Sequence, residues 1–215
     1  QSVLLSNRAK LAIAREEPGE AERLLAQAQD MFARAAAGPL KANQRVHRAT
    51  LLSIESEIAL LAGDNARARS AVLSSLATAS EIYPAGHPDR ILAITNAADT
   101  LFVAGDAASA VSLLDEATNL ARQSLPKDAL LRTEISLKSA LASLALGDRQ
   151  AAQAALRGVV GARKSPIFRS SLPEAAGDFE LLAWSLLDQD TQPSPAQLDE
   201  VLDAIQWTQS SGSAE

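Results

Sequence analysis

A Gly-Asp pair recurs at a constant interval in this chain and constrains its fold more than any other feature. The pair occurs in "LLAGD" (60–64), "FVAGD" (102–106) and "LALGD" (144–148), so each glycine follows the previous one by 42 residues. Apolar residues at helical spacing precede each pair. A fixed period of this length predicts stacked copies of one supersecondary unit, each burying its apolar face against its neighbours.

The residues around each glycine repeat as well. An alanine stands five residues after each glycine and an aliphatic residue nine residues after it. A small residue stands seven residues before the glycine. These positions are Ala68, Ala110 and Ala152, then Val72, Leu114 and Leu156, then Ser56, Ala98 and Ala140. Small residues allow two helices to approach closely, and larger ones would overpack the contact. Each unit is therefore predicted to be a pair of antiparallel helices. The glycine ends the first helix and the aspartate caps the second.

The N-terminal segment fits the same frame with one substitution. Ala9, Ala21 and Leu25 occupy the equivalent apolar positions, but Glu16 replaces the glycine and Pro18-Gly19 marks the turn. The interval to the next unit is longer, and the extra residues fall in the "AAAGPLKANQ" linker. Four helix-pair units are thus predicted over residues 1–164.

The remaining residues predict a terminal pair of helices. One is expected around Glu174–Leu187 and the other around Ala196–Trp207, separated by "DQDTQPSP". Residues 165–209 are interpreted as capping helices or a degenerate fifth repeat, and 210–215 as a disordered tail. The apolar face expected to close the stack consists of Trp184, Leu187, Leu198, Leu202 and Ile205.

Composition narrows the possible functions. The 215 residues carry a net charge of −6 and contain no cysteine. The absence of cysteine excludes disulfides, zinc-thiolate sites and cysteine nucleophiles. An acidic chain without a basic run argues against nucleic-acid binding. No apolar run approaches the ~18 residues of a membrane span, so no membrane contact is expected from this segment. A cytoplasmic location is favoured, with an extracytoplasmic part of a larger protein as the alternative. The chain opens on Gln1, which suggests part of a larger protein or a processed product.

Candidate chemistry is weak by comparison. His87 in "GHPD" would need a partner to act as a base, and no second histidine lies in register. Its other interpretation is a joint between repeats. His47 is expected on a solvated helix face. The aspartates that follow the three glycines lie one repeat apart and are interpreted as caps rather than a carboxylate cluster. No catalytic or nucleotide-binding motif occurs. No catalytic residue, metal or cofactor is therefore predicted.

The repeated residues of this chain resemble those of tetratricopeptide repeats (TPRs). The resemblance rests on Ala98, Leu101, Gly105-Asp106, Ala110, Leu114 and Ala117 and their in-register copies. The 42-residue period and "GHPD" are similar to the kinesin-light-chain variety. The second repeat departs most, because Ser56, Ala59 and Ser75 stand there in place of larger or more typical residues. The resemblance implies an all-α fold, a right-handed α-solenoid of antiparallel helix pairs with a C-terminal capping helix pair.

The resemblance also implies a function. In this family the first helices of the pairs line a concave face that commonly holds a protein or peptide ligand. The positions that map onto that face are Asn7, Lys10, Ser53, Glu57, Thr95, Asn96, Asp99, Phe102, Lys138 and Leu141. Asn96 stands beside two alanines, where it could hydrogen-bond a ligand backbone or instead a neighbouring helix. A peptide-binding scaffold, part of a larger bacterial protein, is the favoured interpretation.

Three rival interpretations of the sequence remain. The solenoid could be a sensor that binds a peptide and controls an attached effector, such as a transcription regulator or a kinase. It could instead serve as a homodimerisation module. The weakest rival is a hydrolase that uses His87.

Overall fold

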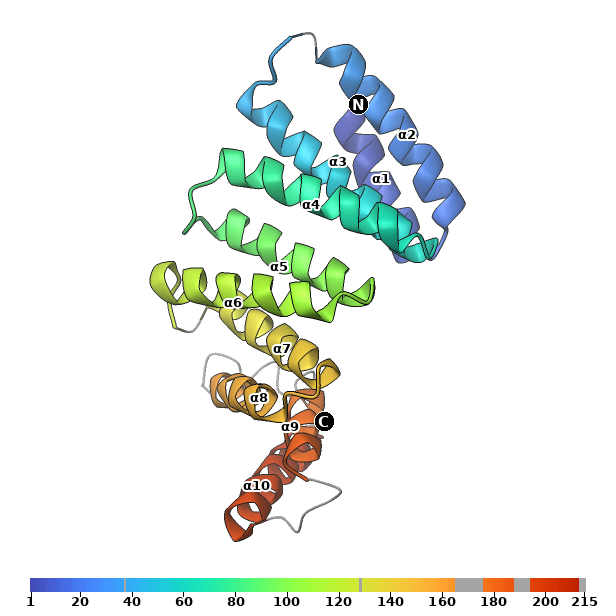
Figure 1. Ribbon diagram of the computed structural model, residues 1–215. Coiled ribbons are helices and arrows are strands. Elements are labelled where there is room, and N and C mark those ends of the chain that lie inside the picture. The colour runs from blue at the N-terminus through green and yellow to red at the C-terminus, as the bar shows by residue number, and fades with distance from the viewer. Residues whose placement is uncertain (37, 128, 165–175, 188–193, 213–215) are drawn as a thin grey trace. The chain divides into compact units, whose positions relative to one another are not determined.

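The structure is a computed structural model that describes residues 1–212 apart from residues 37, 128, 165–175 and 188–193 (Figure 1). The described residues form helices and no strands. The chain divides into two compact units, Gln1–Ser124 and Leu125–Glu215. The first holds α1 (Ser2–Ala14), α2 (Pro18–Ala35), α3 (Ala42–Leu61), α4 (Asn65–Ile82), α5 (Pro88–Val103) and α6 (Ala107–Ser124). The second holds α7 (Leu130–Ala145), α8 (Arg149–Arg163), α9 (Ala176–Leu186) and α10 (Pro195–Gly212).

The turn inside each helix pair has one backbone conformation. Gly63, Gly105 and Gly147 have φ values of 73°, 86° and 78°, in the left-handed region that favours glycine. The amide after each glycine donates to the carbonyl five residues back, as Asp64 does to Ala59 at 2.8 Å. This bond closes the end of the preceding helix. The period in the sequence is therefore a period of helix ends.

The aspartate after each glycine caps the helix that follows, as predicted. Its Oδ1 accepts from the backbone amide three residues on, at 3.0 Å from Arg67 to Asp64 and 3.1 Å from Ser109 to Asp106. Asp148 accepts from Ala151 at 3.0 Å in the same way. Each bond satisfies one of the free amides at a helix start. These carboxylates act in helix capping at three separate turns.

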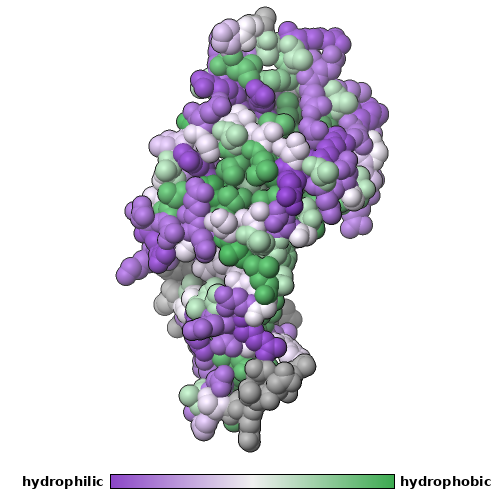
Figure 2. Space-filling model, in the orientation of Figure 1, coloured by the Kyte–Doolittle hydropathy of each residue, from purple (hydrophilic) through white to green (hydrophobic). Residues whose placement is uncertain are grey.

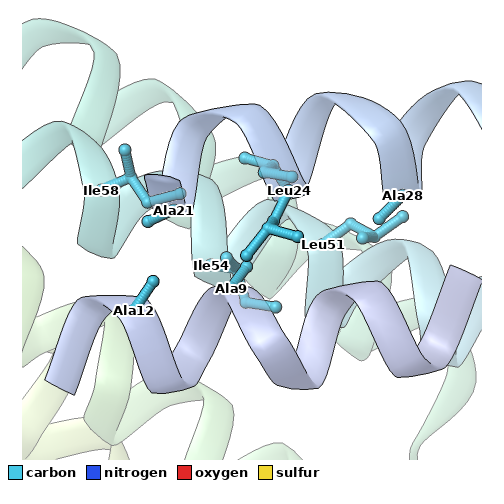
Figure 3. Packing of buried hydrophobic residues seen from close by; sticks show 9 residues of the cluster. Ala9, Ala12, Ala21, Leu24, Ala28, Leu51, Ile54 and Ile58 are labelled. Atoms are coloured by element: carbon cyan, nitrogen blue, oxygen red, sulfur yellow. The ribbon is translucent and has the colours of Figure 1, made fainter. Parts of the chain in front are cut away.

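Alanine brings the helices of each pair together. Ala9, Ala21, Ala68, Ala98 and Ala110 all have no exposed surface. In the first repeat, Ala9 and Ala12 of α1 and Ala21 and Ala28 of α2 surround larger residues from α2 and α3 (Figure 3). The larger members of this core are Leu24, Leu25, Leu51, Ile54 and Ile58. The first helix pair therefore buries its apolar face partly against α3 of the second pair.

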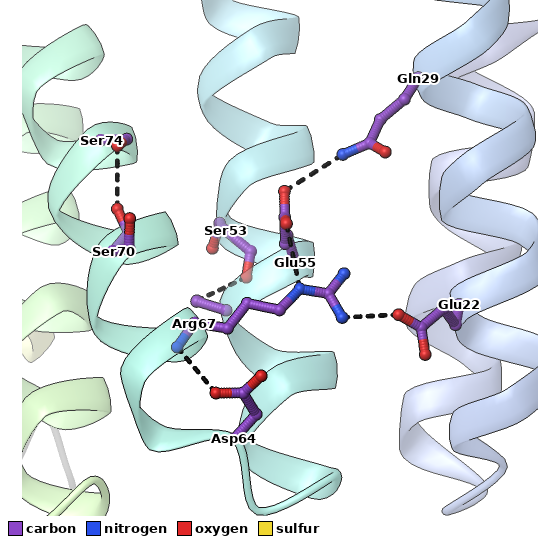
Figure 4. Close-up of polar contacts among 9 residues, drawn as sticks. Glu22, Gln29, Ser53, Glu55, Asp64, Arg67, Ser70 and Ser74 are labelled. Carbon is purple, nitrogen blue, oxygen red and sulfur yellow. Dashed lines mark hydrogen bonds and ion pairs between the residues drawn. The ribbon is translucent and has the colours of Figure 1, made fainter.

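A polar network also joins the first repeat to the second. The guanidinium of Arg67 donates to Glu55 at 3.2 Å and to Glu22 at 2.6 Å, and thus links α4 to α3 and α2 (Figure 4). Gln29 of α2 donates to the other oxygen of Glu55 at 3.2 Å. The sequence frame gave no sign of this network, because none of these residues occupies a repeated position.

In the second unit, α9 and α10 pack on the fourth helix pair. Ala140, Leu156 and Val160 of that pair share a core with Leu182, Ala183, Leu186, Val201 and Ala204. Ion pairs reinforce it: Arg157 binds both carboxylate oxygens of Glu200, at 2.7 and 3.0 Å. Arg163 pairs with Asp178 at 3.0 Å, and Lys164 pairs with Asp203. The boundary between the two compact units falls before α7, so the fourth helix pair belongs to the same unit as α9 and α10.

The apolar face that was predicted to close the stack is exposed, so this prediction is wrong. Trp184 is 72% exposed and Leu202 is 57% exposed, and Leu187, Leu198 and Ile205 are exposed as well. The residues that pack instead are neighbours in sequence, such as Ala183 and Leu186. Both faces of these helices are rich in apolar residues, so helical spacing alone could not select one. The helix α10 also continues through Ser210 to Gly212, which were expected in the tail; residues 213–215 lie outside the described residues.

Hydrophobic side chains reach the surface in patches between hydrophilic ones (Figure 2). Among the large hydrophobic residues that are exposed in the first unit are Val46 on α3 and Leu92 on α5. Both line the groove described next.

Candidate binding groove

A groove in the first unit runs over α3 and α5, the first helices of the second and third pairs. Its larger part, here called the Tyr83 hollow, has a volume of about 200 Å³. Residues from α1, α3, α4 and α5 line it, together with Tyr83 in the joint between α4 and α5. They are Lys10, Val46, Ala49, Thr50, Ser53, Val72, Ser75, Ala79, Tyr83, Asp89, Leu92, Ala93 and Asn96. Most of these side chains are small or aliphatic, which is typical of a surface that holds apolar ligand groups.

The adjoining part, here called the Asp99 hollow, has a volume of about 180 Å³. Its lining comes from α3 and α5 alone: Ser53, Ser56, Glu57, Leu60, Asn96, Asp99, Thr100 and Val103. Ser53 and Asn96 line both hollows. The two hollows are therefore neighbouring parts of one groove, with these two polar side chains where they meet.

Half of the predicted binding residues come together here. Lys10, Ser53, Glu57, Asn96 and Asp99 all line the groove, although they come from three different helices. In the first unit α1 contacts α3 and α3 contacts α5, which brings residues about one repeat apart into one surface.

The other predicted residues lie elsewhere. Thr95 is fully buried, and its hydroxyl donates to the carbonyl of Ile91 at 2.9 Å, so it presents no surface to a ligand. Phe102 is half-buried and lines neither hollow, and Asn7 is exposed on α1 outside both. Lys138 and Leu141 lie on α7 in the second unit, where Lys138 pairs with Glu134 at 4.0 Å.

Burial changes the acidity of one groove carboxylate. The pKa of Glu57 is raised, mainly because the half-buried side chain is poorly hydrated. The ammonium of Lys10 and a hydrogen bond from Ser53, at 3.5 Å, act in the opposite direction but do not offset burial. The groove therefore holds a carboxylate that its own surroundings stabilise incompletely.

The joint between α4 and α5 contributes Tyr83 to the lining of the groove. The ring of Tyr83 stacks on that of His87, with centroids 4.6 Å apart. His87 Nδ1 accepts from the amide of Asp89 at 3.2 Å and caps α5. The histidine therefore lies at a joint between repeats, as "GHPD" predicted. The pKa of Tyr83 is raised, first by burial and then by the carboxylate of Asp89. His87 is thus engaged in a helix cap and a ring stack.

The prediction for His47 is wrong. The residue was expected on a solvated face, but its Nε2 lies 2.8 Å from the hydroxyl of Ser2 and its ring packs edge-on against Phe32. Partial burial lowers its pKa. The first repeat covers this part of α3, because the long linker before α3 places its N-terminal turns beside α1 and α2.

Several groove residues, among them Tyr83, Asp89 and Leu92, were not predicted from the sequence. Ser56 and Ser75 stood out there as departures from the repeat pattern, with no role attached to them. Ser56 lines the Asp99 hollow and Ser75 lines the Tyr83 hollow. In the next two repeats Ala98 and Ala140 stand at the position of Ser56, and Ala117 and Val159 stand at that of Ser75. The size of the residues at these positions therefore did not by itself mark the site.

Two further observations bear on the kind of site. Within the part of the chain that the structure describes, no cluster of three or more histidine, aspartate or glutamate side chains could hold a metal ion. In that same part, no helix combines the length and the apolar character that crossing a bilayer requires.

The fold and the groove define this chain as an all-α protein of stacked helix pairs. No protein-family model matches it, and no curated protein sequence does. Solved structures do match. A putative kinesin light chain of Podosopora anserina with nearly identical TPR-like repeats is 18% identical, with a TM-score of 0.71 over 98% of this chain and 96% of that one.

Two more distant structures agree. BtubC (BKLC) from P. vanneervenii is 12% identical, with a TM-score of 0.70 over 97% of this chain and 77% of that one. A signal transduction ATPase of Pyrococcus horikoshii with a tetratricopeptide repeat sensor is 13% identical, with a TM-score of 0.65 over 97% of this chain and 36% of that one. The chain therefore has the fold of TPR-like repeats of the kinesin-light-chain kind, which confirms the predicted fold class.

Proposed function

We propose that this chain is a protein- or peptide-binding module whose ligand lies in the groove over α3 and α5. The observation that supports the proposal most directly is the pair of adjoining hollows that share Ser53 and Asn96. A ligand lying along the groove would meet aliphatic surface, hydroxyls, an amide and carboxylates within one continuous site. This mixture is typical of recognition surfaces rather than of a packed core.

Asn96 has the central role in this proposal. Its side chain is exposed, lies on α5 and borders both hollows. An amide can donate to a carbonyl and accept from an N–H at once, so it can bind the backbone of an extended peptide. Such contacts hold a peptide in place regardless of its sequence, and the flanking hollows then supply specificity.

The experiment begins with a random dodecapeptide library displayed on phage and selected against the chain. Fluorescence anisotropy then measures how selected peptides bind the wild type, Asn96→Ala and Asp99→Lys. We expect at least tenfold weaker binding in both variants, with helicity unchanged by circular dichroism. Asp115→Lys is the matched control, because Asp115 is exposed on α6 and lines neither hollow. Unchanged affinity in both groove variants would show that the ligand binds elsewhere.

A second candidate is a sensor module that transmits binding to an attached effector. The motivating observation is that one of the structures with this fold carries its repeats as a sensor within a signal transduction ATPase. A sensor requires two states that bind the ligand differently. Hydrogen exchange with and without a selected peptide tests this. Altered protection in helices away from the groove would support the candidate, and changes confined to α3 and α5 would exclude it.

A further inference from the structure

The two hollows differ in chemistry along the groove. Around the Tyr83 hollow, Val46 and Leu92 expose aliphatic surface at the rim, and alanines and Ser75 leave space between the helices. Around the Asp99 hollow, carboxylates of Glu57 and Asp99 stand on opposite helices, α3 and α5. One part of the groove therefore suits an apolar side chain and the other suits a polar one.

The charges that line the groove are unequal. Glu57, Asp89 and Asp99 contribute carboxylates, whereas Lys10 is the single lysine or arginine among the lining residues of the two hollows. Lys10 lines the Tyr83 hollow, whereas the Asp99 hollow is lined by both Glu57 and Asp99. The ammonium of Lys10 acts on Glu57 as well but does not offset the effect of burial. Burial removes hydration from the carboxylate of Glu57, and a cationic group seated between these two helices would stabilise that charge in place of water. An anionic group there would meet two like charges.

Because the two hollows adjoin, the side chains of a ligand that fill them must lie close together along the ligand. The hollows adjoin at Ser53 and Asn96, so two side chains that enter them must come from nearby residues of the ligand. In an extended peptide, residues two positions apart point to the same side, about 7 Å from one another. The residue between them points away, and its backbone lies over Asn96.

We propose that the groove selects extended peptide segments in which a large apolar side chain, seated in the Tyr83 hollow, stands two residues from a lysine or arginine seated in the Asp99 hollow. The inference rests on the proposed function and adds the chemistry of the partner to it. The carboxylates of Glu57 and Asp99 receive the basic side chain. The small side chains of the Tyr83 hollow admit the apolar one, and Asn96 binds the backbone between them.

A library of fluorescein-labelled octapeptides of the form Gly-Ser-Gly-X-Ser-Z-Ser-Gly, with X and Z varied, tests this directly. Anisotropy with the wild-type chain should rank Arg and Lys first at Z, and Leu, Ile, Met and Phe first at X. Binding of these peptides should weaken as salt rises, because the selecting interaction is electrostatic. Replacing Arg by Glu at Z should reduce affinity at least tenfold.

Two variants separate the hollows. Asp99→Lys should invert the preference at Z toward Glu and Asp while the preference at X remains. Ala93→Leu, a half-buried position that lines the Tyr83 hollow, should abolish the preference for large residues at X while Arg remains favoured at Z. Asp115→Lys changes net charge as much as Asp99→Lys and should leave both preferences as in the wild type.

The outcomes distinguish the inference from the proposed function. Equal affinity for Arg, Ser and Glu at Z, a preference for acidic residues there, or no binding by any member of the library overturns the inference. The proposed function still stands in those cases if phage-selected peptides lose affinity in Asn96→Ala and Asp99→Lys. It fails separately if those selected peptides bind both groove variants as they bind the wild type.

Discussion

Glu16 holds the left-handed backbone conformation that Gly63 holds at the equivalent turn one repeat later. Its φ is 57°, against 73° at the glycine. Among the described residues, no other non-glycine residue has a positive φ. The bond that closes the helix end is present too, from Glu17 to the carbonyl of Ala12 at 2.9 Å. The first repeat thus forms the same turn with a residue that is strained in it.

Glu16→Gly should therefore stabilise the chain by about 1 kcal/mol, because glycine adopts positive φ without a clash of Cβ. Urea unfolding followed by circular dichroism measures the change. Gly63→Ala should have the opposite sign and a similar size, since nothing lies within 4 Å of an added Cβ and only the backbone is strained. Glu17→Gly, at a φ of −105°, is the control and should give no gain. A gain there as large as in Glu16→Gly would contradict the strain.

Arg67→Met should destabilise the first unit by about 1 kcal/mol, because it removes charge-assisted bonds to Glu22 and Glu55 that join three helices. A double-mutant cycle with Glu55→Gln isolates the coupling between the two side chains. Arg34→Met is the matched control. Arg34 pairs with Asp30 on the same helix but is 77% exposed, so the loss should stay within about 0.5 kcal/mol.

Ala110→Trp should destabilise the fold by about 1–3 kcal/mol, because Ala110 has no exposed surface and α6 has no space for a larger side chain there. Thermal and urea unfolding both report the loss. Ala108→Trp places the same side chain on the exposed side of the same helix, and it should change stability little. Equal losses at both positions would mean that tryptophan disturbs α6 itself rather than the contact between helices.

The raised pKa of Glu57 predicts a dependence of stability on pH. The folded state binds the proton of this carboxyl more tightly than the unfolded state, so its contribution favours folding most at low pH. That contribution is lost as pH rises through the folded pKa, which lies above the ordinary value of 4.5. At pH 7 the buried carboxylate then opposes folding.

Glu57→Gln should consequently be more stable than the wild type at pH 7, and the difference should shrink toward zero below pH 4.5. Urea unfolding of both proteins across this range measures it. Lys10 and Ser53 are the neighbours that act on Glu57, and both remain in the variant. A difference that is constant with pH would show that burial does not perturb this carboxyl.

The sequence predicted helix ends better than helix surfaces. Gly105, Asp106 and Ala110 each have a local reason for their position, a turn, a cap or a close contact, so spacing alone located them. Exposure is set by neighbours instead. Ser53 and Thr95 are equivalent in the repeat, yet Ser53 borders the groove and Thr95 is fully buried. Periodicity also could not choose between Trp184 and Leu186, which lie on two apolar faces of one short helix.

The recurrence of one turn has a consequence for how such a chain can change length. A segment that begins after Gly63 and ends at Gly105 starts with an aspartate cap and finishes with a left-handed glycine, as does the segment that follows it. Removing or duplicating 42 residues at these points would rejoin equivalent helix ends and preserve register. The same operation would remove or double α4 and α5, which together line much of the groove, so a change in copy number that the backbone tolerates would change what the groove recognises.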